Sequence, residues 1–247
     1  MFKLPIIIAL VASTCVRLLA QGGPPLKTDD PGTPGSGHWE INLAVTADLT
    51  HREKLFQLPL LDINYGQGAR MQIKYEVPWE VMRTPERKVS GAGDSIVGVK
   101  WRFLDEDRRG AALSMYPQFQ FLSTPAAVRR GLAERNWELL LPMEFEKSLS
   151  FISVNGEIGY NIRQRDKDQL IYGLAVGSEL TRSFELVSEA HGTCLRDSHE
   201  NQILFNVGAR WKLSRRLTLL MAGGRVVVHP GQTESKNLAY FATQFNF

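Results

Sequence analysis

The residues best suited to metal chemistry in this sequence lie close together, between positions 191 and 199. His191, Cys194 and His199 carry the nitrogen and sulfur atoms that bind transition metals. All three donors fall on one short stretch of chain, which differs from the separated pairs of ligands in structural zinc sites. The sequence therefore predicts no metal site, and it implies no cofactor.

Nucleophilic catalysis is the second chemistry that this stretch suggests, because a serine beside a histidine forms the reactive pair of many hydrolases. Some twelve-stranded membrane barrels are phospholipases that carry such a pair on the outer barrel surface. The candidate residues here are His51, His191, His199, His229, Ser188, Thr193 and Ser198. The segment EAHGTC lacks a serine at the required spacing. We therefore expect no enzyme and keep a barrel-embedded enzyme acting on lipid as an alternative.

Charged side chains at alternating positions form the largest set of polar candidates. The acidic group is Glu138, Glu144, Glu146, Glu157, Glu179, Glu185 and Glu189. The basic group is Lys74, Lys100, Arg102, Arg210 and Lys212. Both groups lie on the polar side of segments in which apolar and polar residues alternate, so these segments must position them.

The alternating segments are predicted strands, because a period of two places successive side chains on opposite faces. In SVNGEIGYNIR, Val154 and Ile158 share one face while Glu157 and Asn161 share the other. Twelve such segments are predicted, at 39–50, 55–65, 69–80, 93–104, 111–122, 135–147, 149–163, 168–181, 184–191, 200–213, 216–228 and 237–247. The stretch MAGGRVVV predicts a bulge or kink at Gly223 and its neighbouring glycine, and no helix is predicted.

A membrane barrel accounts for this alternation better than a soluble β-sandwich does. The apolar face carries large side chains, including all the tryptophans near segment ends, as in the aromatic girdles of membrane barrels. These are Trp39, Trp79, Trp101, Trp137 and Trp211. Short and longer connections also alternate, although imperfectly. The sequence therefore predicts an all-β fold, a transmembrane up-and-down antiparallel β-barrel of about 12 strands.

The C-terminus keeps the alternating pattern to the last residue. Phe241, Phe245 and Phe247 are spaced by even numbers of positions and share one face. A closed membrane barrel leaves no unpaired edge in lipid, so the last strand must pair with the first. These three residues resemble the signature that the outer-membrane assembly machinery recognises, and we expect that machinery to be a partner.

The N-terminus predicts export across the inner membrane. Lys3 precedes an apolar run of about nine residues, and a helix that spans a bilayer needs roughly 20. This pattern predicts a signal peptide at residues 1–20, with cleavage after Ala20 as the first choice. Cys15 leaves lipidation as an alternative, which Arg17 disfavours because it follows so closely.

Three regions follow from these signals: a signal peptide at 1–20, a Gly/Pro-rich periplasmic leader or lumen plug at 21–38, and an outer-membrane barrel at 39–247. Removal of Lys3 and Arg17 with the signal leaves 27 basic and 26 acidic residues. This balance gives no reason to expect a nucleic-acid partner.

The leader and first strand, LKTDDPGTPGSGHWEINLA at residues 26–44, resemble the opening of a family of outer-membrane transporters named for the meta-pathway of phenol degradation. The motif covers this stretch alone, and the remainder agrees in its signal peptide, alternating strands and terminal phenylalanine. The resemblance implies an outer-membrane β-barrel that moves hydrophobic or aromatic small molecules. It carries no catalytic residues over to this chain.

In such a barrel the charged side chains belong in the lumen, because charges are costly against lipid. If consecutive strands are neighbours, an acidic wall faces a basic wall, or the charges form ion pairs that fill the lumen. Barrels of about 8 strands are filled by side chains, and barrels of 16–18 strands enclose open channels. A twelve-stranded barrel lies between them, so the sequence is consistent with a narrow pore and with a plugged barrel.

The resulting prediction is an outer-membrane protein that acts as a passive channel or transporter for small molecules. Its expected partners are outer-membrane lipid, the assembly machinery and a solute that the sequence does not identify. The alternatives are the lipid-active enzyme and a structural barrel without transport.

Overall fold

The computed structural model describes residues 23–133, 135–196, 201–228 and 236–247, and the predicted signal peptide lies outside this part of the chain. The strands are β1 (Trp39–Leu49), β2 (Lys54–Gln67), β3 (Met71–Arg83), β4 (Lys88–Ala92), β5 (Ser95–Leu104), β6 (Ala112–Met115), β7 (Gln118–Phe121), β8 (Glu138–Leu149), β9 (Ile152–Arg163), β10 (Gln169–Thr181), β11 (Phe184–Leu195), β12 (Asn201–Lys212), β13 (Leu217–Val228) and β14 (Lys236–Asn246). The helices are α1 (Glu106–Arg109) and α2 (Pro125–Arg130).

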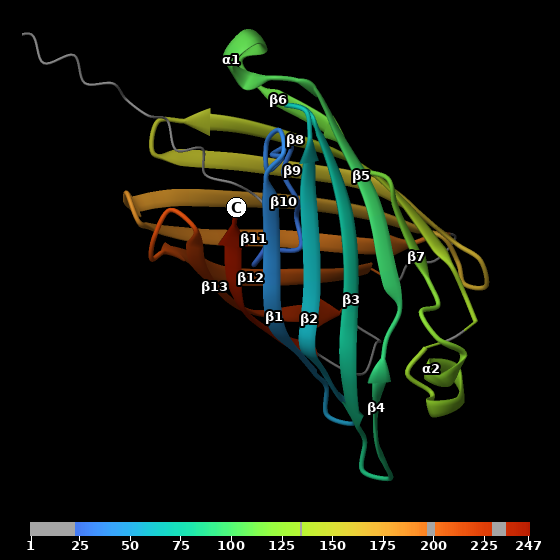
Figure 1. Cartoon of the computed structure of the whole chain (residues 1–247). Coiled ribbons are helices and arrows are strands. Elements are labelled where there is room, and N and C mark those ends of the chain that lie inside the picture. The colour runs from blue at the N-terminus through green and yellow to red at the C-terminus, as the bar shows by residue number, and fades with distance from the viewer. Residues whose placement is uncertain (1–22, 134, 197–200, 229–235) are drawn as a thin grey trace, which may run out of the picture.

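All these strands belong to one antiparallel sheet that closes into a twelve-stranded barrel (Figure 1). Strands β4 and β5 are two parts of one barrel strand, because they pair with successive parts of β3. Strands β6 and β7 are likewise two parts of one strand between β5 and β8, interrupted at Tyr116 and Pro117. The predicted fold class is therefore confirmed.

The barrel closes through its first and last strands, β1 and β14, which pair along their lengths. At the end of this pair, the backbone N–H of Trp39 donates to the carbonyl of Phe247, and the N–H of Phe247 donates back, both at 3.0 Å. The chain therefore stays in the sheet up to its last residue, because an unpaired edge would expose backbone polar groups to lipid.

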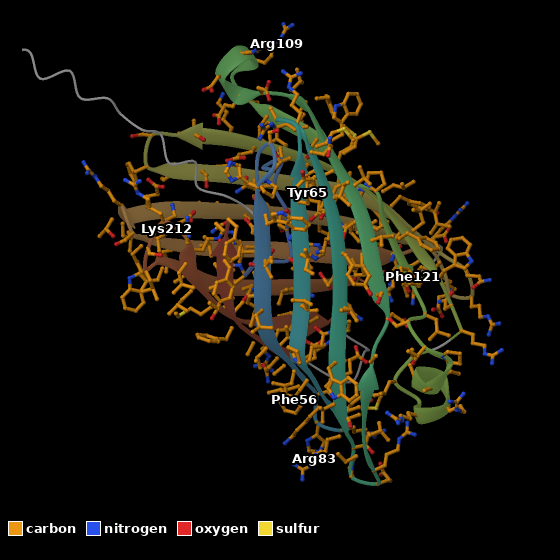
Figure 2. All side chains as sticks on the ribbon, viewed as in Figure 1. Phe56, Tyr65, Arg83, Arg109, Phe121 and Lys212 are labelled. Carbon is orange, nitrogen blue, oxygen red and sulfur yellow. The ribbon has the colours of Figure 1, made fainter. Side chains whose placement is uncertain are left out.

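The two faces of the wall differ as the alternation predicts. On β5, Lys100 is 2% exposed and points inward, whereas its neighbour Trp101 is 53% exposed on the outer surface. Large apolar side chains cover that outer surface along most strands, as Figure 2 shows. The inner face is largely polar, so the apolar face meets lipid and the polar face lines the lumen.

The barrel has a turn end and a loop end, marked in Figure 2 by Arg109 and Arg83. The turn end holds the connections at 150–151 and 182–183, together with the start of β1 and the C-terminus. Short turns face the periplasm in outer-membrane barrels, so the loop end is the external end.

Two details of the prediction are wrong. Two short helices are present, although none was predicted. Helix α2 begins after Thr124, whose hydroxyl accepts a hydrogen bond from the N–H of Ala127 at 3.3 Å. None of the described helices is long and apolar enough to cross a membrane.

The second error concerns the glycine pair of β13, where a bulge or kink was predicted. The register from β12 to β13 runs through Gly223 and Gly224 without a shift. A Cβ at Gly224 would lie 2.6 Å from the carbonyl oxygen of Phe205, so this glycine permits a close approach of the neighbouring strand. The register shifts occur elsewhere, for example between Gln57 and Leu60 of β2.

Candidate functional site

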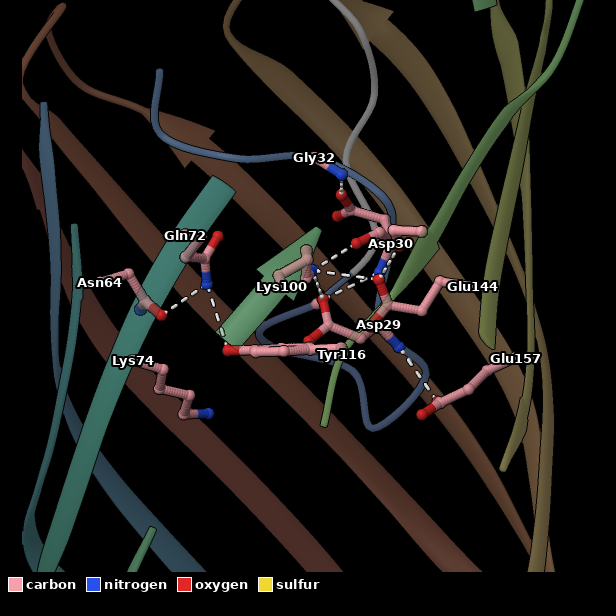
Figure 3. A network of polar contacts seen from close by, with 12 residues as sticks. Asp29, Asp30, Gly32, Asn64, Gln72, Lys74, Lys100, Tyr116, Glu144 and Glu157 are labelled. Atoms are coloured by element: carbon pink, nitrogen blue, oxygen red, sulfur yellow. Dashed lines mark hydrogen bonds and ion pairs between the residues drawn. The ribbon is translucent and has the colours of Figure 1, made fainter. Parts of the chain in front are cut away.

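The leader enters the barrel and contacts side chains that point into the lumen (Figures 1 and 3). The Glu189 carboxylate of β11 accepts hydrogen bonds from the backbone N–H groups of Lys27, at 2.8 Å, and Thr28, at 2.7 Å. The Arg210 guanidinium of β12 donates to the carbonyl oxygens of Gly23 and Pro24, each at 3.0 Å. Two buried charges of opposite sign therefore hold the leader through its backbone.

Lys100 is the centre of a second set of contacts with the leader (Figure 3). Its ammonium lies 3.0 Å from Asp29 Oδ1 and 3.3 Å from Glu144 Oε2, and it also donates to the carbonyl of Asp30. The ring of Tyr116 lies beneath it, with the ammonium 4.5 Å from the ring centroid. The buried ammonium of Lys100 thus pairs with one carboxylate of the leader and with one carboxylate of the wall.

Apolar contacts and a glycine of the wall also help to accommodate the leader. Leu26 packs with Ala175 of β10 and Val187 of β11 in a small buried cluster. Gly173 of β10 faces Thr28, and a Cβ on this glycine would lie 2.3 Å from Thr28 Oγ1. The wall therefore leaves room for the leader at a position where any larger residue would collide with it.

The predicted acidic and basic groups are interleaved in the structure. Glu144 contacts Lys100, and Glu185 contacts Arg210 at 3.2 Å. The two groups meet because β11 and β12 are neighbours, while only β6, with the small Ser114, lies between β5 and β8. Ion pairs along the wall therefore take the place of a separation between two walls.

The other members of the two groups occupy several depths. Glu157 accepts a hydrogen bond from the N–H of Asp29 at 3.2 Å, and Lys74 lies 2.7 Å from Glu76 Oε2. Glu146 is buried, and its Oε1 has no hydrogen-bond partner among the described residues. The remaining members lie nearer the barrel ends and are partly exposed: Glu138, Glu179, Arg102 and Lys212.

Several charged residues of this candidate site were not predicted. Asp29 and Asp30 belong to the quoted leader motif, yet no role was assigned to them. Asp62 and Glu76 flank Lys74, whose ammonium is 3.6 Å from Asp62 Oδ1. The register of the segment that holds Asp62 is hidden by the irregular pairing earlier in β2, so the alternation did not reveal its inward direction.

A cavity of about 460 Å³ lies in the lumen between the leader and the loop end of the barrel. Its floor includes Gly23 to Lys27, and its walls carry both apolar and charged side chains. A second hollow of about 550 Å³ lies at the external rim, between Asp94, Glu138, Arg163 and Asp166. A small molecule can therefore be accommodated on the outer side of the leader.

Two of the candidates for nucleophilic catalysis lie on opposite faces of β11. Ser188 lies on the exposed face of β11, whereas His191 of the same strand points inward, 4.0 Å from Glu157 Oε2. Among the described residues no group of three or more His, Cys, Asp or Glu side chains could hold a metal ion. His199, Ser198 and His229 lie outside the described residues.

Solved structures resemble this chain in fold. An outer-membrane channel from Pseudomonas putida F1 aligns with a TM-score of 0.68 and 14% identity, over 88% of this chain and 99% of that one. The translocator domain of the autotransporter NalP from Neisseria meningitidis gives 0.60 and 9%, over 84% and 88%. The NanC porin gives 0.58 and 10%, over 83% and 98%. No protein-family model and no curated protein matches the sequence.

These similarities establish the fold. Together with the apolar outer surface, they place the chain in the outer membrane, in contact with lipid.

Proposed function

We propose that this protein is a channel of the outer membrane for the passive passage of small molecules, with the leader as a plug in its lumen. The observation that carries the proposal is the cavity of about 460 Å³ whose floor is the leader. A binding cavity on the external side of a short removable segment is the arrangement of a channel in a closed state.

The contacts of the leader favour a plug that can leave. Most of its polar anchors are side chains of the wall, including Glu189 and Arg210, which bond to the leader backbone. When the leader leaves, these groups regain partners from water, so the barrel itself need not unfold. Its release would join the cavity to the periplasmic end.

The solutes that suit this cavity are small molecules with an apolar, often aromatic, body. Leu55, Leu60, Leu140, Ile171 and Tyr240 contribute apolar surface to its lining. The sequence resemblance to the family named for the meta-pathway of phenol degradation points to the same class, and we propose membership of that family on this basis.

Planar-bilayer conductance of the purified protein tests the proposal. We expect rare, brief openings for the chain that retains the leader and sustained conductance for a variant that lacks residues 21–38. Heat-dependent migration on a gel must first show that both barrels are folded. Two folded barrels without any conductance would refute the channel, and equal conductance would refute the plug.

A further inference from the structure

The charges around the outer cavity are unequal in number. Its described lining residues include the carboxylates of Asp29, Asp48, Asp62, Glu76 and Glu157 and two lysines. The lining therefore carries more negative than positive charge, with its single histidine counted as neutral.

Lys236 pairs with Asp48, and the other four carboxylates still outnumber the two lysines of the lining, Lys27 and Lys74. Lys74 lies 2.7 Å from Glu76 and 3.6 Å from Asp62, so one ammonium serves two carboxylates. Lys100, behind the floor of the cavity, is shared in the same way between Asp29 and Glu144. The wall thus retains negative charge that a bound ligand can compensate.

One hollow at the rim of the barrel has the same sign. The hollow at the external end is lined by the carboxylates of Asp94, Glu138 and Asp166, with Arg163 as the only basic group among its described lining residues. Arg163 already pairs with Glu138 at 3.0 Å and with Asp166 at 2.7 Å. The carboxylates of this hollow favour a cation over an anion at this part of the rim.

Apolar surface lies directly beside the carboxylates of the cavity. Asp48 on β1 is flanked in the register by Leu55 of β2 and Leu238 of β14. Deeper in the lumen, Asp62 pairs in the register with Glu76. A ligand that spans this wall therefore meets an apolar surface with Asp48, which pairs with Lys236, at its outer end and with two carboxylates at its inner end.

Between these carboxylates lies an aromatic ring. Tyr240 packs against the apolar cluster that includes Leu60, and it lines the cavity. Aromatic faces attract cations as well as apolar groups, so Tyr240 suits a ligand that has both. A carboxylate ligand would instead meet like charges in a partly desolvated site, which disfavours its binding.

We propose that the outer cavity selects amphipathic organic cations, in which an apolar or aromatic body carries a protonated amine. The body lies along Leu60 and Tyr240, and the ammonium approaches Glu76 and Asp62. This inference rests on the proposed channel function and narrows its solute to one charge class.

Three probes with one ring and different head groups test the charge class: phenethylamine as the cation, phenethyl alcohol as the neutral compound and phenylacetate as the anion. Their binding to the folded protein with its leader is measured at pH 7 by isothermal titration calorimetry. We expect the amine to bind about ten-fold more tightly than the alcohol, with no measurable binding of phenylacetate. Equal binding of amine and alcohol, or binding of phenylacetate, would overturn the inference.

Two variants locate the ammonium site. Glu76→Gln should bring the affinity for the amine close to that for the alcohol, because one excess carboxylate is removed. Glu53→Gln, in an exposed loop, is the matched control and should preserve the ratio. If Glu76→Gln does not fold, Asp62→Asn makes the same test at the neighbouring carboxylate. An unchanged ratio in the folded variant would contradict the assignment.

Uptake of the same probes by proteoliposomes separates this inference from the channel proposal. If the alcohol and the amine pass at equal rates and bind with equal affinities, the channel proposal stands and the cation preference is overturned. A binding preference for the amine without passage of any probe would support the site and overturn the channel.

Discussion

Gly173 of β10 and Thr28 of the leader meet so closely that a Cβ on Gly173 would lie 2.3 Å from Thr28 Oγ1. The absence of a side chain at this inward position is what lets the leader pass along the wall. Within the wall, the same Cβ would lie 3.1 Å from Cδ2 of His191, a side chain that has to move only slightly to admit it.

Gly173→Val should therefore expel the leader while the barrel stays folded. We expect sustained conductance in planar bilayers, approaching that of a chain without its leader. Gly156→Val is the matched control on the adjacent strand, because a Cβ there meets its neighbours only at ordinary distances of 3.9 Å. Gating like that of the parent protein in a folded Gly173→Val variant would contradict this role of the glycine.

Glu189 should determine how firmly the leader is held. Glu189→Gln replaces one acceptor oxygen by an NH₂ group, so either the N–H of Thr28 or the side-chain amide of Asn206 loses its acceptor, a loss of about 1–3 kcal/mol. Trypsin should then cleave after Lys27 faster, since the bond is reached only when the leader leaves the lumen. Cleavage at the rate of the parent protein, or equal acceleration by the control Glu179→Gln, would argue against the anchor.

The sequence is informative where the alternation is regular. Val154 and Glu157 on β9 could be assigned to opposite faces because a period of two needs no knowledge of the neighbouring strands. The Thr124 cap and the six-residue helix α2 lay in a predicted loop, because so short a helix shows no periodicity. Local signals for its start were present in Thr124 and Pro125.

The site could be predicted only in part, because its contacts join distant positions. Lys27 and Glu189 are 162 positions apart, and no local pattern links a leader to a strand of the opposite half of the chain. The charged residues of the lumen were identified from their alternation, whereas their partners depend on which strands adjoin. Lys100 illustrates this point, since its ion-pair partners Asp29 and Glu144 come from the leader and from β8.

The external loop between β9 and β10 should lose order in acid. The backbone N–H of Arg163 and the hydroxyl of Tyr160 donate to Asp168 and hold the pKa of that carboxyl below its usual range. A lowered pKa means that this stabilisation is complete above the unfolded value, about 3.9, and is lost as the pH falls through the lowered value.

Hydrogen–deuterium exchange of peptides covering 160–170 tests this dependence. Asp168→Asn should expose the loop at pH 7, and the difference from the parent protein should shrink at pH 2, after correction for intrinsic exchange rates. A difference that persists undiminished in acid would show that the carboxylate charge is not the cause.

Phe247 should serve the final step of assembly. Its backbone pairs with Trp39, and its ring stacks on Phe245 with centroids 6.4 Å apart. Deletion of Phe247 removes both hydrogen bonds that end the closure of the barrel, so less folded protein should reach the outer membrane while secretion continues. Heat-dependent gel migration of membrane fractions measures the yield. Phe151→Ala is an exposed aromatic control at the same end, and its yield should be normal.

The carboxylates of Glu144 and Glu146 should set the ion preference of the periplasmic half of the lumen. Both are buried in the lumen, and Glu144 lies 3.3 Å from Lys100 of β5. Conversion of both to glutamine preserves their size and leaves Lys100 with Asp29 as its nearest carboxylate.

In a channel opened by removal of the leader, the double change should lower the cation-over-anion permeability ratio while conductance persists. A reduction of about five-fold corresponds to about 1 kcal/mol, the interaction of two charges at 4 Å in water. With the leader in place the same change should lower the thermal stability, because the buried ammonium loses one of its two carboxylates. Reversal potentials in a salt gradient and the temperature of unfolding measure the two effects. An open pore with unaltered selectivity would show that these carboxylates do not face the permeating ions, because charges that line a narrow pore act on every ion that passes.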